Sequence, residues 1–194
     1  MASFGIGIVI QSALLEYYTA TDVRLPAGEI ITESIRVTDG IAIGWFSLIT
    51  LIVAVVVLSS LQLFLSRTAL GRAFRATADD PETAQLMGID DKHVYGIAMA
   101  VAFLTVAVAG VFFGSRTTFA PSSGSSQLLF GFEAVVIGGL GSLWGTLLGG
   151  IVLGVSQTLG NQVSVGWGQL VGHLVFLAVL GFRPHGLFGS GVRT

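Results

Sequence analysis

The chain has 194 residues, of which 53% are hydrophobic and only 10% are charged, and its mean hydropathy is +0.85. Soluble domains carry about 25% charged residues, so this composition argues against a water-soluble domain and favours a protein of the lipid bilayer. The absence of cysteine excludes disulfides and thiolate metal sites, and a net charge of −2 without a basic patch gives no indication of nucleic-acid binding.

Uncharged stretches predict most of the membrane segments. Residues 2–15 are apolar but short, as at the end of a helix whose beginning is missing, whereas residues 41–65 and 94–114 are uncharged runs of membrane length. At about 1.5 Å per residue, each of these two runs can cross a hydrocarbon core of about 30 Å. Residues 165–182 form another apolar stretch. We therefore expect an all-α fold, a polytopic membrane helical bundle of about 5–6 membrane segments.

The apolar region at residues 128–160 is too long for one simple span, and glycines interrupt it. We expect two short spans, or a half-helix and a span, hinged near residues 138–142, with a re-entrant hairpin as the alternative. Two stripes of small residues repeat every four positions, which predicts close helix packing or, alternatively, a flexible wall of a translocation path. The stripes are Gly141, Gly145 and Gly149, and Ser142, Thr146, Gly150 and Gly154.

Basic residues assign the hydrophilic segments to sides of the membrane. Residues 66–93 hold four Lys and Arg residues, against two in residues 16–40. Because Lys and Arg set orientation, residues 66–93 are expected to form a cytoplasmic loop and residues 16–40 to face outward. The tail, residues 183–194, is then cytoplasmic. The whole chain, residues 1–194, is expected to form a single transmembrane domain.

The cytoplasmic loop is expected to contain two helices. Residues 69–78 are rich in helix formers, and Asp80 followed by Pro81 indicates a stop and a restart. Asp80 is a good N-cap, and proline suits the first helical position. Gly88 suits the left-handed position that ends a helix. The second helix, residues 81–87, is too short to be stable without something to pack on.

This second helix has features of a docking surface. Ala84 and Gly88 lie four positions apart and carry little side chain, so that another backbone could approach closely. Leu86, Met87 and Ile89 offer apolar anchors. An ordinary solvated loop with incidental caps is the alternative.

Three blocks of the sequence resemble one family. Residues 82–88 have the spacing E-x-A-x3-G, which resembles the cytoplasmic signature of ABC importer permeases, and the wider loop is similar to the branched-chain amino acid (Liv-type) permeases. Residues 134–150 resemble that family's VxGGxGSxxGxxxGG segment, and residues 183–189 resemble its terminal RPxGLFG. Family members are usually longer and begin with helices absent here, so the chain resembles a permease without its N-terminal portion.

The resemblance implies a transport subunit rather than an enzyme, for branched-chain or related amino acids, in the plasma (inner) membrane of a prokaryote. It implies ATP hydrolysis on separate ATP-binding cassette subunits, a second permease subunit in a homo- or heterodimer, a periplasmic or lipid-anchored substrate-binding protein, and surrounding membrane lipid. It implies no cofactor, metal or nucleic acid. The ATPase-coupling loop that it implies comprises Glu82, Thr83, Ala84, Leu86, Met87, Gly88 and Ile89.

Polar residues in the apolar runs suggest a translocation path. Glu133 is the only acid in any apolar run, and an intramembrane ionisable residue is a functional candidate. It could meet the ammonium group of a substrate or pair with Arg116. Gln157, Asn161, Gln169 and His173 are expected mainly to form interhelical hydrogen bonds. The candidate translocation path comprises Glu133, Gly138, Gly139, Gly141, Ser142 and His173.

No catalytic or metal site is predicted, because the sequence has no nucleophile–base pair, no nucleotide-binding Walker motif and no ligand spacing among its three histidines. Four readings remain open: the importer permease for amino acids, the same for urea or short amides, a secondary transporter or channel that works without ATPases, and a non-transporting fragment.

Overall fold

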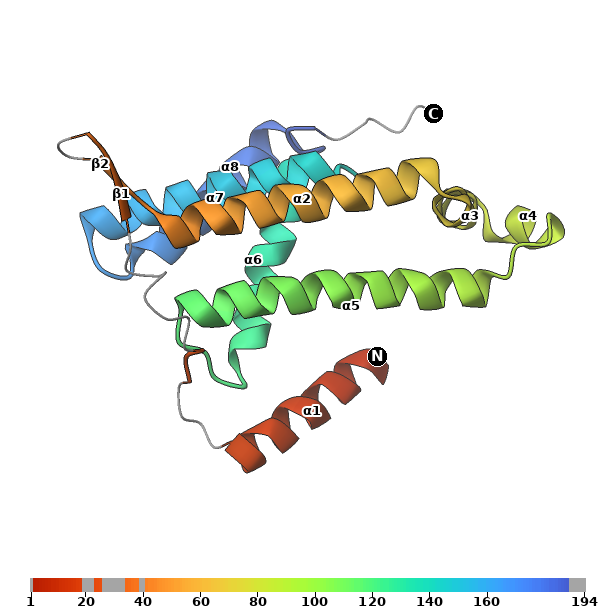
Figure 1. Ribbon diagram of the computed structural model, residues 1–194, viewed down its shortest axis with the longest axis horizontal. Coiled ribbons are helices and arrows are strands. Elements are labelled where there is room, and N and C mark those ends of the chain that lie inside the picture. Colours follow the sequence, from red (N-terminus) through yellow and green to blue (C-terminus); the bar gives the residue numbers. More distant parts are fainter. Residues whose placement is uncertain (1, 19–22, 26–33, 39–40, 189–194) are drawn as a thin grey trace. The chain divides into compact units, whose positions relative to one another are not determined.

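The computed structural model describes residues 2–18, 23–25, 34–38 and 41–188. Their contacts divide the chain into two compact units. The central unit is Ala20–Ala120, and the C-terminal unit combines Met1–Thr19 with Pro121–Thr194. Helices dominate both units, which confirms the expected helical membrane bundle (Figure 1).

Within its described residues, the central unit contains a short hairpin and four helices. The elements are β1 (Ser34–Thr38), β2 (Ile41–Gly44), α2 (Trp45–Arg67), α3 (Ala69–Asp79), α4 (Pro81–Leu86) and α5 (Asp91–Arg116). The two strands are antiparallel, and Ile35 lies opposite Ile43. The expected span at residues 41–65 is therefore wrong at its start, because the β-branched residues that open it pair as a strand and the helix begins at Trp45.

Helices α2 and α5 run alongside each other, and α3 and α4 connect them at one end (Figure 1). Both are long and apolar enough to cross a membrane, and no residue of α2 is buried within the described chain. The N-terminus of α5 is capped by Asp90, which accepts hydrogen bonds from the backbone nitrogens of Lys92 at 3.1 Å and His93 at 3.4 Å. Arg116 lies in the last turn of α5, where a cation is favourable to the helix dipole.

The described part of the C-terminal unit contains four helices: α1 (Ala2–Tyr18), α6 (Ser123–Gly138), α7 (Leu143–Val163) and α8 (Trp167–Phe182). The glycine-rich region at residues 128–160 thus contains parts of two helices, and its turn falls at residues 139–142 as expected. Gly139 and Gly141 have φ values of +99° and +88°, which a residue with a side chain rarely adopts. The described ranges contain three helices that meet the length and composition of a membrane span, namely α2, α5 and α7.

Helix α7 packs against α6 through one stripe of glycines. A Cβ atom added to Gly149 would lie 2.9 Å from the backbone nitrogen of Gly138, and one added to Gly145 would clash with the carbonyl of Gly138. The second stripe differs, because a Cβ atom at Gly150 or Gly154 would meet no atom within 4 Å. Close helix packing is therefore confirmed for one stripe only.

Candidate coupling segment and translocation path

Helix α4 begins at the cap that the sequence predicts. Oδ1 of Asp80 accepts hydrogen bonds from the backbone nitrogens of Glu82 at 3.1 Å and Thr83 at 3.2 Å, while Oδ2 accepts from the Thr83 hydroxyl at 2.5 Å. Pro81 occupies the first turn, as expected. The hydrogen bonds from the Thr83 hydroxyl, the Thr83 backbone and the Glu82 backbone lower the pKa of Asp80, because they stabilise its charged form.

The end of α4 is also capped. The backbone nitrogen of Ile89 donates to the Ala84 carbonyl at 3.1 Å, and that of Gly88 donates to the Gln85 carbonyl at 2.9 Å. Gly88 has φ +81°. This pair of hydrogen bonds around a left-handed glycine is a Schellman motif. The helix ends at Leu86, one residue before the predicted end, because Met87 serves as the C-cap.

Ala84 is the buried residue of α4, whereas the apolar side chains of Leu86 and of the C-cap residue Met87 are exposed. Ala84 is only 4% exposed, so its small side chain fits the packing of the chain itself, which corrects the expectation that Ala84 leaves room for another backbone. Leu86 is 87% exposed and Met87 is 79% exposed. Ile89 is half-buried, and a Cβ atom at Gly88 would meet no atom within 4 Å. We call the exposed residues Leu86, Met87 and Gly88 the α4 tip.

A tight joint connects α3 to the end of α2. The Thr68 hydroxyl donates to the carbonyl of Phe64 at 2.7 Å and accepts from the backbone nitrogen of Gly71 at 3.0 Å. Nη1 of Arg75 donates to the carbonyl of Leu65 at 2.5 Å. A Cβ atom at Gly71 would lie 2.6 Å from the carbonyl carbon and Cα of Leu65, so only glycine fits.

The other end of the loop is tied to α5. Nε2 of Gln85 donates to Oδ2 of Asp91 at 2.9 Å, across the turn between α4 and α5. Helix α4 is thus connected to α2 through α3 and to the first turn of α5 directly. The sequence motifs indicated the α4 caps, but neither the joint at Gly71 nor this link was predicted.

The candidate path residues Glu133 and His173 come together in the C-terminal unit. Oε1 of Glu133 on α6 lies 2.5 Å from Nδ1 of His173 on α8, and the ring of Phe130 stacks on that imidazole with centroids 5.5 Å apart. Glu133 is 3% exposed, and its Oε2 has no hydrogen-bond partner among the described residues. The interhelical hydrogen bond expected of His173 is confirmed, whereas pairing of Glu133 with Arg116 stays a prediction.

The other interhelical polar residues lie near the turn between α7 and α8. Oδ1 of Asn161 accepts a hydrogen bond from the backbone nitrogen of Gly168 at 3.1 Å. The side chain of Gln157 packs beside Gly172, where a Cβ atom would lie 3.1 Å from its Cγ. The interhelical hydrogen bond expected of Asn161 is thus confirmed, whereas the one expected of Gln157 stays a prediction.

The C-terminal block of the sequence packs against the α6–α7 turn. The backbone nitrogen of Leu187 donates to the carbonyl of Ile137 at 2.8 Å, and that of Phe188 donates to the carbonyl of Gly138 at 3.0 Å. Carbonyls at the end of a helix such as α6 have no partner within the helix, so these hydrogen bonds satisfy them. Gly186 has φ +77° and lies directly against Gly139. Two of the three recognised blocks therefore form one structural feature, which their separation in the sequence did not reveal.

The apolar helices of membrane length and the loop helices between α2 and α5 define a helical membrane protein. Residues 2–180 match the family described as branched-chain amino acid transport system / permease component, and the chain belongs to this family. Together with its apolar helices, this makes it a multi-pass membrane protein of a prokaryotic plasma (inner) membrane.

Individual relatives carry the same kind of name. The high-affinity branched-chain amino acid transport system permease protein BraD of Pseudomonas aeruginosa is 31% identical over 195 residues, which cover 97% of this chain and 63% of the relative. The corresponding LivH protein of Escherichia coli K12 is 28% identical over 199 residues, with the same coverage. The autoinducer 2 import system permease protein LsrC of Escherichia coli O9:H4 is 29% identical over 150 residues, covering 73% of this chain and 42% of the relative.

The chain thus spans 63% of the length of the branched-chain amino acid permeases named here. No solved structure matches it.

Proposed function

We propose that this chain is the membrane-spanning permease subunit of an ATP-driven ABC importer for branched-chain or related amino acids. Its partners would be ATP-binding cassette ATPases, a second permease subunit and a substrate-binding protein. The observation that carries the proposal is the α4 tip, where Leu86 and Met87 are exposed. It ends a helix that is capped at both ends, lies in the expected cytoplasmic loop and is connected to two membrane-length helices.

The geometry suits docking for an energetic reason. Removing a large apolar side chain from water contributes about 1.5–3 kcal/mol, so burial of Leu86 and Met87 against a partner would stabilise a complex by a few kcal/mol. Because the caps and the Gln85–Asp91 hydrogen bond already order α4, docking would not have to fold it first. Movement of the α4 tip would then reach α2 through the joint at Gly71 and α5 through Asp91.

The test changes the α4 tip in the intact importer. Leu86→Glu with Met87→Glu should sharply reduce ATPase co-purification and substrate uptake, because two charges would replace the apolar contact. Val165→Glu is the matched control, since Val165 is 97% exposed in the turn between α7 and α8. Gly88→Trp should have the same uncoupling effect as the double variant. Normal co-purification and uptake in both tip variants would refute docking at α4.

The translocation path is proposed to pass the Glu133–His173 pair and the turn formed by Gly138, Gly139, Gly141 and Ser142. A buried carboxylate oxygen without a donor is costly, so Oε2 of Glu133 is a place where an ammonium group could bind once the helices separate. Glu133→Gln should lower uptake while ATPase co-purification stays normal. Unchanged uptake would remove Glu133 from the path and leave it a packing role.

A further inference from the structure

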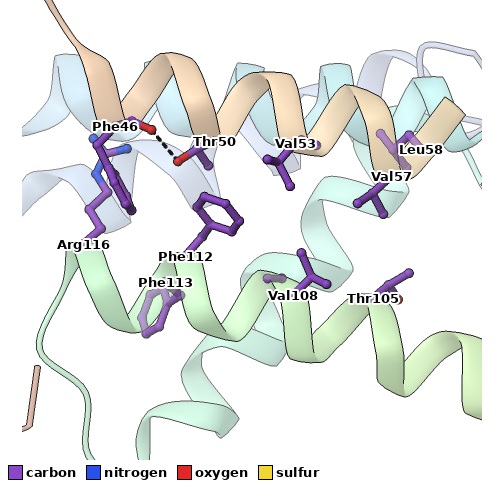
Figure 2. A pocket seen from close by; sticks show the side chains of 12 residues that line it. Phe46, Thr50, Val53, Val57, Leu58, Thr105, Val108, Phe112, Phe113 and Arg116 are labelled. Carbon is purple, nitrogen blue, oxygen red and sulfur yellow. Dashed lines mark hydrogen bonds between the residues drawn. The ribbon is translucent and has the colours of Figure 1, made fainter. Parts of the chain in front are cut away.

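A long apolar groove lies between α2 and α5 of the central unit. Its volume is about 510 Å³, and Figure 2 shows side chains from both helices pointing into it. On α2 the lining runs from Phe46 to Leu58, and on α5 from Arg116 back to Thr105. Neither the loop helices α3 and α4 nor the Glu133–His173 pair contributes to it.

The chemistry of the groove is apolar along its length and cationic at one end. Its two hydroxyl groups donate to their own helices, since Thr50 bonds the carbonyl of Phe46 and Thr105 that of Ala102, both at 2.7 Å. Arg116 is exposed and forms no ion pair with any described residue. The lining contains no acidic side chain. A zwitterionic amino acid would therefore find no carboxylate for its ammonium group, whereas a molecule with an apolar body and an anionic head would fit.

The dimensions restrict the occupant further. From Phe46 to Leu58 the groove extends roughly 18 Å along α2, at about 1.5 Å per residue. One leaflet of a hydrocarbon core of about 30 Å is roughly 15 Å deep. At the Arg116 end, the rings of Phe46 and Phe112 approach each other across the groove with centroids 5.9 Å apart. A transmembrane helix is about 10–12 Å wide, so it would not lie between these rings.

We propose that this groove binds one acyl chain of an anionic phospholipid, and that the guanidinium of Arg116 binds its phosphate. The chain would lie along α2 and α5 through one leaflet, and it would pass beside the contacting rings of Phe46 and Phe112 below the headgroup. Arginine suits this role because its planar fork donates two hydrogen bonds to phosphate oxygens and its stem can lie along apolar surface. The bound acyl chain would fill space between α2 and α5, the two helices that α3 and α4 connect.

The experiment reconstitutes the full chain into phosphatidylglycerol vesicles that contain a trace of phosphatidylglycerol with a photoreactive acyl chain, and identifies the labelled peptides by mass spectrometry. Ala109→Trp fills the groove, and Ala107→Trp is the matched control, because Ala107 is exposed on the same helix but outside the lining. Labelling of the α2 and α5 groove peptides should fall about fivefold or more in Ala109→Trp, as for a loss of about 1 kcal/mol, and stay normal in the control.

A second variant tests the headgroup. Arg116→Gln should remove the preference for labelled phosphatidylglycerol over labelled phosphatidylcholine, whereas Arg72→Gln, which removes an exposed charge of α3, should not. Size exclusion compares the oligomeric state of both tryptophan variants with that of the wild type, and both should elute as the wild type does. Equal labelling of the groove peptides in Ala109→Trp and Ala107→Trp would mean that the label reports unspecific boundary lipid. Loss of self-association in Ala109→Trp with unchanged labelling would mean that a helix from another copy occupies the groove. Either result, or an unchanged lipid preference in Arg116→Gln, would overturn the proposal.

Discussion

Two neighbouring glycines of α7 should respond oppositely to the same substitution. An alanine Cβ at Gly149 would lie 2.9 Å from the backbone nitrogen of Gly138 and closer still to the carbonyl oxygen of Ala134, both on α6. Since these are backbone atoms, no side chain can turn away, and α7 must move off α6. At Gly150, one position further along the same helix, the Cβ would meet no atom within 4 Å.

The size of the difference follows from these two environments. Adding a methyl group to a tightly packed site typically costs about 1–3 kcal/mol, which is expected of Gly149→Ala. Replacing an unobstructed helical glycine by alanine stabilises by roughly 0.5–1 kcal/mol, which is expected of Gly150→Ala. The two variants should therefore differ by roughly 1.5–4 kcal/mol, or about 3–16 °C in Tm at 2–4 °C per kcal/mol.

Thermal unfolding of both variants in the same detergent, at one scan rate, checks this prediction, since membrane proteins often unfold irreversibly and only relative values are then meaningful. The wild type should fall between the two variants. Equal Tm values for Gly149→Ala and Gly150→Ala would refute the close contact between α6 and α7.

Three further predictions concern the loop helices α3 and α4 and the Glu133–His173 pair. Gly71→Ala should loosen the joint between α2 and α3 and raise proteolysis of the loop, whereas Gly96→Ala, where a Cβ meets no atom within 4 Å, should not. Because the pKa of Asp80 is lowered in the folded loop, its charged form stabilises α4 above the ordinary aspartate pKa of about 3.9, and this contribution is lost as pH falls through the lowered value. Limited proteolysis should therefore show the wild-type loop opening as pH falls through that window. The loop of Asp80→Ala should already be open at neutral pH, and Asp80→Asn, which keeps a cap, should be intermediate. Glu133→Leu and His173→Leu should have non-additive effects on Tm, with a coupling of about 1 kcal/mol, and additive effects would mean that the two side chains do not interact in the membrane.

Features encoded within a few adjacent residues were predictable from the sequence. The caps at Asp80 and Gly88 were predicted because a cap needs only its own helix end: a short side chain that accepts hydrogen bonds, or a residue free to adopt positive φ. The turn at residues 139–142 was predictable for the same reason, since glycines interrupt an otherwise continuous apolar run. The start of α2 was not, because an isoleucine-rich run suits a strand as well as a membrane helix, and pairing with β1 decides between them.

Features that depend on another element were not predictable. The spacing of Gly145 and Gly149 equals that of Gly150 and Gly154, yet only the first pair packs on α6, because the direction from which α6 approaches is a tertiary property. Glu133 and His173 are distant in sequence, and Arg116 was as reasonable a partner for Glu133 until the structure placed an imidazole beside it. Likewise, no local signal indicated that Leu187 and Phe188 would complete the end of α6.

The glycines of the recognised blocks fall into two physical classes, and this changes how the E-x-A-x3-G spacing is interpreted. Gly71 and Gly149 are needed because a side chain would collide with a neighbouring backbone, whereas Gly88 faces open space and is needed for its positive φ. Within the spacing, Ala84 is small because it packs inside the chain, and Gly88 turns the backbone so that Leu86 and Met87 precede a sharp bend. The motif therefore specifies the shape that exposes the two apolar residues Leu86 and Met87. A docking partner would recognise those side chains, and the motif residues themselves would hold them in place.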